Sequence, residues 1–187
     1  MHYVLIACQA LLAVVFVIAV VGKLRGPDEF VASIVALRLL PRAASRVAAY
    51  AVLGGEVVVV VALAVPYTVA VGLAGAAALL LALTTGIVVA LRRGQSAPCR
   101  CFGASAAPLG RTHVVRNLVL AGLAGAGLAA GAMAGEGAMH LAGVVLALVA
   151  AGVGALIVVR LDDLVGLFGP ADRRQAGAPL TPPRRAR

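Results

Sequence analysis

The residues best suited to chemistry in this chain are Cys99 and Cys101, two cysteines separated by a single arginine. Thiols at this spacing can close a small, strained disulfide, because their Cα atoms lie near the distance that a disulfide spans. Strained disulfides are readily reduced and exchange with other thiols. Arg100 between the cysteines, and further arginines nearby in the sequence, favour the reactive thiolate form. The pair is therefore a candidate redox site, and two inert loop cysteines are the alternative.

A metal site is a competing interpretation of the same cysteines, with His113 as a third ligand. Structural zinc takes four protein ligands, and no fourth Cys or His is expected on that side of the molecule. We therefore expect neither a metal nor another cofactor. Cys8 lies far from the pair along the chain and is expected to be a packing residue.

Glu56 is a second candidate, because it interrupts an apolar stretch long enough to cross a membrane. A carboxylate inside a bilayer is unfavourable unless it faces protein and has a partner. Thr84 and Thr85 are expected at a similar depth and could donate hydrogen bonds to it. Lys23 and Arg116 could reach it from the membrane interface. A proton relay, a ligand contact and a purely structural role remain open.

The elements that must position these residues follow from the composition. The chain has 187 residues, of which 63% are hydrophobic and 12% charged, about half the charged share of a soluble domain. A transmembrane helix needs about 20 mostly apolar residues. Five segments meet this condition: about 4–22, 47–65, 68–91, 114–134 and 141–159. The alternating pattern of a membrane barrel is absent, so the predicted fold is an all-α integral membrane bundle.

Two of the connections between these segments are short, at 66–67 and 135–140. The second and third segments, and likewise the fourth and fifth, should therefore be antiparallel neighbours. Gly127, Gly131 and Gly135 recur every four residues along the fourth segment and at the position just after it. Such a stripe permits close helix packing in lipid, either inside the molecule, which we favour, or between two copies.

All 16 basic residues fall on one side of the predicted bundle, in the two longer connections with the start of the fourth segment and in the C-terminal region. They are Lys23, Arg25, Arg38, Arg42, Arg46, Arg92, Arg93, Arg100, Arg111, Arg116, Arg160, Arg173, Arg174, Arg184, Arg185 and Arg187. Short loops rich in Lys and Arg remain on the cytoplasmic side of a membrane. We therefore predict a multi-pass inner-membrane protein with its N-terminus outside and its C-terminus in the cytoplasm. This charge placement, together with the absence of Trp, argues against nucleic-acid binding.

The connection between the first two segments contains an acidic pair followed by apolar residues near helical spacing: Phe30, Ile34, Leu37 and Leu40. This pattern predicts a short amphipathic helix on the membrane surface, with Asp28 and Glu29 in its first turn. Residues 1–165 should form the transmembrane domain. Residues 166–187 should form a basic, Pro- and Arg-rich cytoplasmic tail without fixed structure.

Together these residues resemble the pattern of the MauE family, the methylamine-utilisation membrane proteins grouped with DoxX-like redox-associated proteins. The resemblance extends over about residues 4–134. Its elements, in order, are Gly22-Lys23-Leu24, Phe30 after the acidic pair, Leu39-Leu40-Pro41, Glu56, Cys99-Arg100-Cys101-Phe102-Gly103 and Arg116-Asn117.

The resemblance implies a DoxX-like core of four helices plus a fifth, and a role in thiol–disulfide exchange. For the namesake proteins it implies involvement in making methylamine dehydrogenase, whose small subunit is rich in disulfides. Cys99 and Cys101 would be the redox pair, supported by Lys23, Glu56, Arg100, Arg116 and Asn117. The expected partners are the lipid bilayer and a thiol-bearing protein. The alternative is a non-enzymatic transporter or assembly scaffold centred on Glu56.

Overall fold

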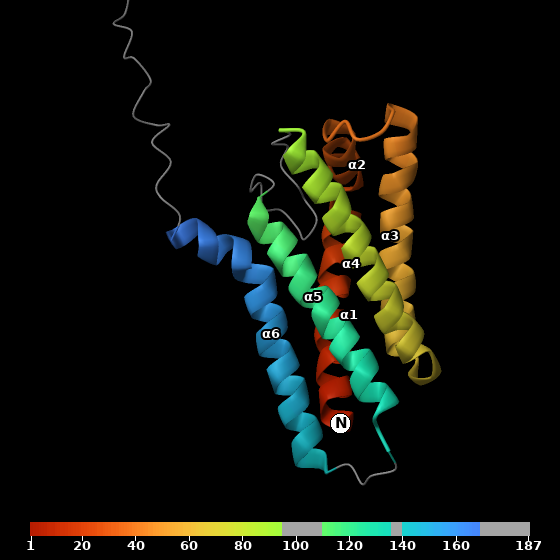
Figure 1. Ribbon diagram of the computed structural model, residues 1–187, viewed down its shortest axis with the longest axis vertical. Coiled ribbons are helices and arrows are strands. Elements are labelled where there is room, and N and C mark those ends of the chain that lie inside the picture. Colours follow the sequence, from red (N-terminus) through yellow and green to blue (C-terminus); the bar gives the residue numbers. More distant parts are fainter. Residues whose placement is uncertain (95–109, 136–139, 169–187) are drawn as a thin grey trace, which may run out of the picture.

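The computed structural model of the protein describes residues 1–94, 110–135 and 140–168, the last seven of these by their backbone alone. Its described residues are almost entirely helical (Figure 1). The helices are α1 His2–Arg25, α2 Pro27–Ala36, α3 Arg42–Ala64, the 3-10 turn η1 Pro66–Thr68, α4 Val69–Arg92, α5 Arg111–Ala132 and α6 Leu141–Phe168.

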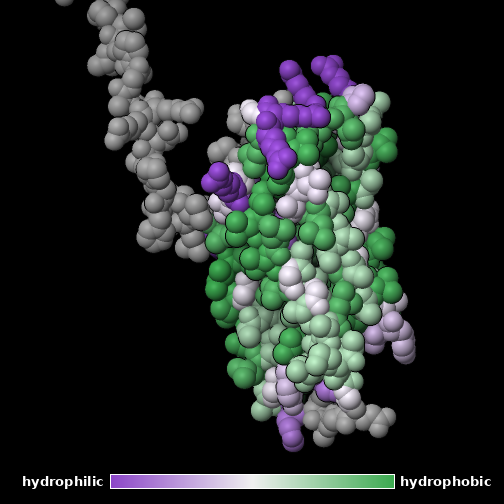
Figure 2. Space-filling model, in the orientation of Figure 1, coloured by the Kyte–Doolittle hydropathy of each residue, from purple (hydrophilic) through white to green (hydrophobic). Residues whose placement is uncertain are grey.

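Five of these helical segments are long and apolar enough to cross a membrane, which confirms the predicted all-α bundle. They are longer than the apolar segments in the sequence, because basic residues extend α1 at its end and α3 and α5 at their starts. Large apolar side chains remain exposed along the bundle, including Val58 on α3, Val71 on α4 and Leu146 on α6. Such an exterior is solvated by lipid rather than water, and Figure 2 shows it as a broad hydrophobic belt. The chain is a multi-pass membrane protein.

Helix α1 is the centre of the bundle and packs against α3, α5 and α6. Helix α4 packs against α3 and α5. The main apolar core lies between these helices and includes Leu12, Val15, Leu63, Leu80 and Leu120, all nearly or fully buried. The bundle therefore has a dry interior built largely from leucine, valine and alanine.

The two short connections have different consequences for packing. Helices α3 and α4 are antiparallel neighbours, as predicted. The prediction was wrong for α5 and α6, which run antiparallel but pack against α1 instead of each other. The N-terminus of α1 binds their connection, because His2 Nε2 lies 2.6 Å from the Gly135 carbonyl oxygen and the His140 backbone N–H donates to the Tyr3 hydroxyl.

Small residues on α6 explain why this helix prefers α1. A Cβ at Gly143 would collide with the Tyr3 ring, and one at Gly154 would lie 2.7 Å from Leu11 Cδ1. Ala147, Ala151 and Ala155 are buried at four-residue spacing on the same helix. Close approach through small side chains is the usual means of helix association in lipid.

The glycine stripe on α5 also serves packing inside the molecule, as favoured from the sequence. A Cβ at Gly127 would lie 3.1 Å from Cys8 Cβ, and Leu5 of α1 lies beside Gly131. A Cβ at Gly135, in contrast, would meet no described residue within 4 Å. Cys8 itself is buried, in agreement with its predicted packing role.

Helix α2 is the predicted amphipathic helix, and it lies at the end of the bundle where α1 ends and α3 begins (Figure 1). Pro27 begins it, with Asp28 and Glu29 in its first turn, where acids complement the helix dipole. Phe30 is buried, and Leu37 packs with Ile87 and Ala90 of α4. Leu40 is exposed because the helix ends at Ala36, so the predicted apolar stripe stops at Leu37.

Candidate functional site

Buried polar side chains are concentrated in one half of the bundle, the half nearer α2. Among the described residues they are Lys23, Ser45, Glu56, Thr84, His113, Arg116 and Asn117. The other half of the core is formed by leucine, valine and small residues. Since unpaired polar groups are unfavourable in an apolar core, this asymmetry distinguishes the half nearer α2 as the candidate functional end.

Lys23 and Glu56 form a buried ion pair between α1 and α3. Lys23 Nζ lies 2.7 Å from Glu56 Oε1, and their side chains are only 1% and 3% exposed. Glu56 is fourteen residues from the first residue of α3, which places it about 21 Å along the helix and deep in the apolar layer. The pair therefore joins two transmembrane helices where lipid would not solvate either charge.

The local sequence explains why Lys23 reaches this position. It lies in the last turn of α1, where a cation complements the helix dipole. The chain turns at Gly26 and Pro27 begins α2, so α2 folds back beside the end of α1. This brings the Phe30 ring to 5.2 Å from Lys23 Nζ, a distance at which a cation and an aromatic face attract.

The second oxygen of the Glu56 carboxylate, Oε2, is buried and has no hydrogen-bond partner among the described residues. Thr84 and Thr85 were candidate donors to Glu56 in the sequence, but their hydroxyls bond elsewhere in the structure. The Thr84 hydroxyl donates to the Leu80 carbonyl and the Thr85 hydroxyl to the Leu81 carbonyl. Hydroxyls inside helices commonly bond the carbonyl one turn earlier, and Thr85 is also exposed.

The first two turns of α5 contribute His113, Arg116 and Asn117, all nearly completely buried. An Arg116 Nη atom lies 3.3 Å from His113 Nδ1, as expected for side chains three residues apart on one helix face. Asn117 Oδ1 is buried without a partner among the described residues. The sequence interpretation placed Arg116 and Asn117 in the site and considered His113 only as a metal ligand. The three-residue spacing from His113 to Arg116 is the signal in the sequence that could have predicted their pairing.

The predicted redox residues Cys99, Arg100 and Cys101 lie outside the described residues. The described chain before them ends at Gly94, and it resumes at Gly110. Both points adjoin ends of helices at the same end of the bundle as α2 (Figure 1). Within the described chain, no group of three or more His, Cys, Asp or Glu residues could hold a metal ion.

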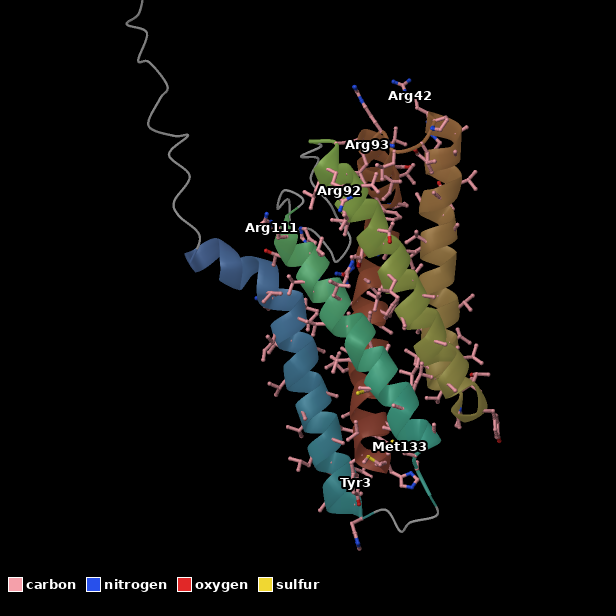
Figure 3. The ribbon with its side chains drawn as sticks, viewed as in Figure 1. Tyr3, Arg42, Arg92, Arg93, Arg111 and Met133 are labelled. Carbon is pink, nitrogen blue, oxygen red and sulfur yellow. The ribbon has the colours of Figure 1, made fainter. Side chains whose placement is uncertain are left out.

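The exposed cations lie at this same end of the molecule. Figure 3 shows Arg42 at the start of α3, Arg92 and Arg93 at the end of α4, and Arg111 at the start of α5. Figure 2 shows most of the strongly hydrophilic side chains at this end of the bundle. The predicted grouping of basic residues on one side is therefore confirmed for those that the structure describes, which we call the basic end.

The sequence model of one family, described as methylamine utilisation protein MauE, matches residues 1–130. A protein named methylamine utilization protein MauE, from Paracoccus denitrificans, is 37% identical over 123 residues. The aligned part is 65% of this chain and 66% of that relative, so the chain spans just under two thirds of the relative's length. Comparison with solved structures found no match. The matched residues include α1 to α4, the cysteine pair and most of α5, and the chain belongs to the MauE family.

Proposed function

We propose that this protein is a membrane component of methylamine utilisation that supports thiol–disulfide exchange during the maturation of a partner protein, with Cys99 and Cys101 as the exchanging pair. The observation that carries the proposal is the position of the pair in the chain. The segment that contains it connects α4 to α5 at the basic end, and α5 begins there with buried Arg116 and His113. Family membership supports the pathway, since the matching relative is named for methylamine utilisation.

The electrostatics of this end suit a thiolate. Arg93 directly follows α4, and Arg111 and Arg116 lie in the first two turns of α5, so all three are close to an end of this connection. The N-terminus of α5 adds the positive end of its helix dipole. Cations and helix N-termini stabilise a thiolate relative to a thiol. A thiolate is the form that attacks a disulfide.

The exchange requires only the two cysteines and a partner disulfide. One cysteine, as a thiolate, attacks a sulfur of the partner's disulfide, which forms a mixed disulfide and releases a partner thiolate. The second cysteine then attacks the mixed disulfide, so that Cys99 and Cys101 become joined and the partner dithiol is released in reduced form. The reverse sequence oxidises a partner dithiol and returns both cysteines to thiols.

The test is thiol trapping in cells that carry the Cys8→Ser variant, with acid quenching followed by maleimide labelling before and after reduction. We expect two reducible, blocked thiols in the Cys8→Ser protein. We expect a trapped mixed disulfide in whichever of Cys99→Ser and Cys101→Ser keeps the attacking cysteine, because the cysteine that would release the partner is then absent. Cys8→Ser alone is the matched control and should exchange normally, since Cys8 is buried near the opposite end of the bundle. Two thiols that stay free in the presence of oxidant, with no trapped species in either variant, would contradict the proposal.

We further propose that the basic end faces the cytoplasm, in an inner membrane, as the positive-inside rule implies. In a variant that lacks all three cysteines, Tyr67→Cys reports on the opposite end, because Tyr67 is 95% exposed in the α3–α4 connection. Arg93→Cys reports on the basic end. We expect an impermeant maleimide to label Tyr67→Cys in spheroplasts, and Arg93→Cys only after permeabilisation. The opposite pattern would place the basic end, with its exchange partner, outside the cytoplasm.

A second candidate function is a transporter or assembly scaffold centred on Glu56. It is supported by the buried Oε2 of this residue, which has no hydrogen-bond partner in the described part of the chain. A carboxylate oxygen in this position can accept a proton or contact a ligand. A folded variant without the ion pair separates the two functions. If Lys23→Met/Glu56→Met retains thiol exchange, the exchange does not depend on the ion pair. If that variant loses methylamine-dependent growth while Cys99→Ser and Cys101→Ser retain it, the Glu56-centred function is favoured.

A further inference from the structure

A groove of about 800 Å³ runs between α2 and α3 at the basic end, away from the buried ion pair. Its α2 wall is apolar apart from Asp28 and includes Val31 and Val35, whereas its α3 wall carries Arg42, Arg46 and Tyr50. This volume is within the range of about 300–1,000 Å³ that is typical of small-molecule sites. One wall therefore suits hydrocarbon and the other suits an anion.

The three α3 residues lie on one face of the helix, because they are spaced four residues apart. Successive members are about 6 Å further from the helix start, so the two guanidinium groups lie nearest the bundle end and Tyr50 lies deeper. Tyrosine is enriched at this depth, where its ring contacts hydrocarbon and its hydroxyl contacts headgroups. Along α3, the order from the two arginines to Tyr50 matches the order from the phosphate to the start of the acyl chains in a phospholipid.

The charges of the two arginines in the groove are only partly offset by the described residues around them. Neither Arg42 nor Arg46 forms a salt bridge within the described chain, and both are exposed. Helix α3 begins at Arg42 without a side-chain cap, so its first backbone N–H groups add a positive helix end. Among the described residues, Asp28 of α2 is the one acidic residue that lines the groove. Two arginines and one aspartate give the groove a net charge of one positive unit, which a single phosphodiester would balance.

We propose that this groove binds an anionic phospholipid with a hydroxyl-bearing headgroup, such as phosphatidylglycerol. Arg42 and Arg46 bind the phosphate, as planar guanidinium groups do through paired hydrogen bonds. The headgroup hydroxyls donate to the Asp28 carboxylate, and one acyl chain lies along Val31 and Val35. The bound lipid fills the space between the surface helix and α3 and stabilises the position of α2.

The test uses the full-length protein, purified in detergent and reconstituted in nanodiscs with equal amounts of phosphatidylglycerol and phosphatidylcholine. Lipid that remains bound after re-extraction is identified by mass spectrometry. We expect phosphatidylglycerol to be enriched over phosphatidylcholine for the wild-type chain. Arg42→Gln/Arg46→Gln should weaken its binding by about 30-fold, from the attraction of two basic residues near an anionic surface.

Arg92→Gln/Arg93→Gln is the matched control, since it removes two exposed arginines from the same end but outside the groove. It should retain the enrichment. Arg42→Lys/Arg46→Lys should retain charge and bind with intermediate affinity, because lysine cannot form the paired bonds. Equal loss in the control would show general charge attraction and overturn the site. Unchanged enrichment in Arg42→Gln/Arg46→Gln, or displacement of the lipid by millimolar inorganic phosphate, would overturn it as well.

Discussion

Replacement of Lys23 by methionine is expected to destabilise the folded bundle by about 3–5 kcal/mol, because it leaves the Glu56 carboxylate buried without its cationic partner. Glu56→Met should have an effect of similar size, since it leaves Lys23 charged at a position where its side chain is only 1% exposed. Both changes also remove the ion pair that joins α1 to α3. The measurement is unfolding in detergent micelles, followed by the loss of helical signal.

The double variant Lys23→Met/Glu56→Met should be more stable than either single variant. Replacing a buried ion pair by apolar side chains of similar volume is often neutral or stabilising, so we expect most of the lost stability to return. Arg25→Gln is the matched control, because Arg25 lies in the same last turn of α1 but is exposed, and it should change stability little. Additive losses in the double variant would show that the two side chains do not act as a pair.

Gly72→Ala is expected to destabilise the α3–α4 hairpin by about 1–3 kcal/mol, the usual effect of overpacking. A Cβ at this position would lie 2.9 Å from the backbone nitrogen of Leu63 and 3.0 Å from the carbonyl carbon of Ala62. A flexible side chain could move away, but here the obstacle includes backbone. The Thr68 hydroxyl holds that backbone by donating to the Ala62 carbonyl at 2.8 Å, so the two helices must separate.

Gly122→Ala is the control for this change. It makes the same substitution inside a transmembrane helix, but a Cβ at Gly122 meets nothing within 4 Å. The gain in helix propensity is the same for both, up to about 1 kcal/mol, so the difference between the two variants isolates the collision. Thermal unfolding of the two purified variants in one detergent gives that difference. Equal stability would show that the hairpin adjusts without loss.

Hydrophobic length and charge placement were sufficient to predict the class of fold. Each transmembrane helix satisfies its own backbone hydrogen bonds, so a run of about 20 apolar residues specifies a helix without reference to its neighbours. The five spans, the surface helix after Pro27 and the gathering of basic residues at one end were predictable for this reason. The resemblance to the MauE family was also visible in the order of short motifs, and the family comparison bears it out. The role of Cys99 and Cys101 remains a prediction.

Packing partners were decided only by the tertiary structure. The short connection between α5 and α6 suggested a hairpin of neighbours, yet α6 packs on α1 because Gly143 and Gly154 admit Tyr3 and Leu11. In lipid, the choice of neighbour depends on the shape of both surfaces, which a single segment does not reveal.

The partner of Glu56 was likewise determined by the tertiary structure. The expected depth of each residue in the membrane gave four candidate donors to Glu56: Thr84, Thr85, Lys23 and Arg116. In the structure, Lys23 Nζ lies 2.7 Å from Glu56 Oε1. The threonine hydroxyls bond the backbone of their own helix, which is nearer than any other helix.

The groove between α2 and α3 had no signal in the sequence at all, because its two walls come from separate helices. The sequence determined which segments cross the membrane and which end of each segment lies at the basic end. The tertiary structure determined which side chains meet there, because such contacts depend on helix rotation and close packing rather than on composition.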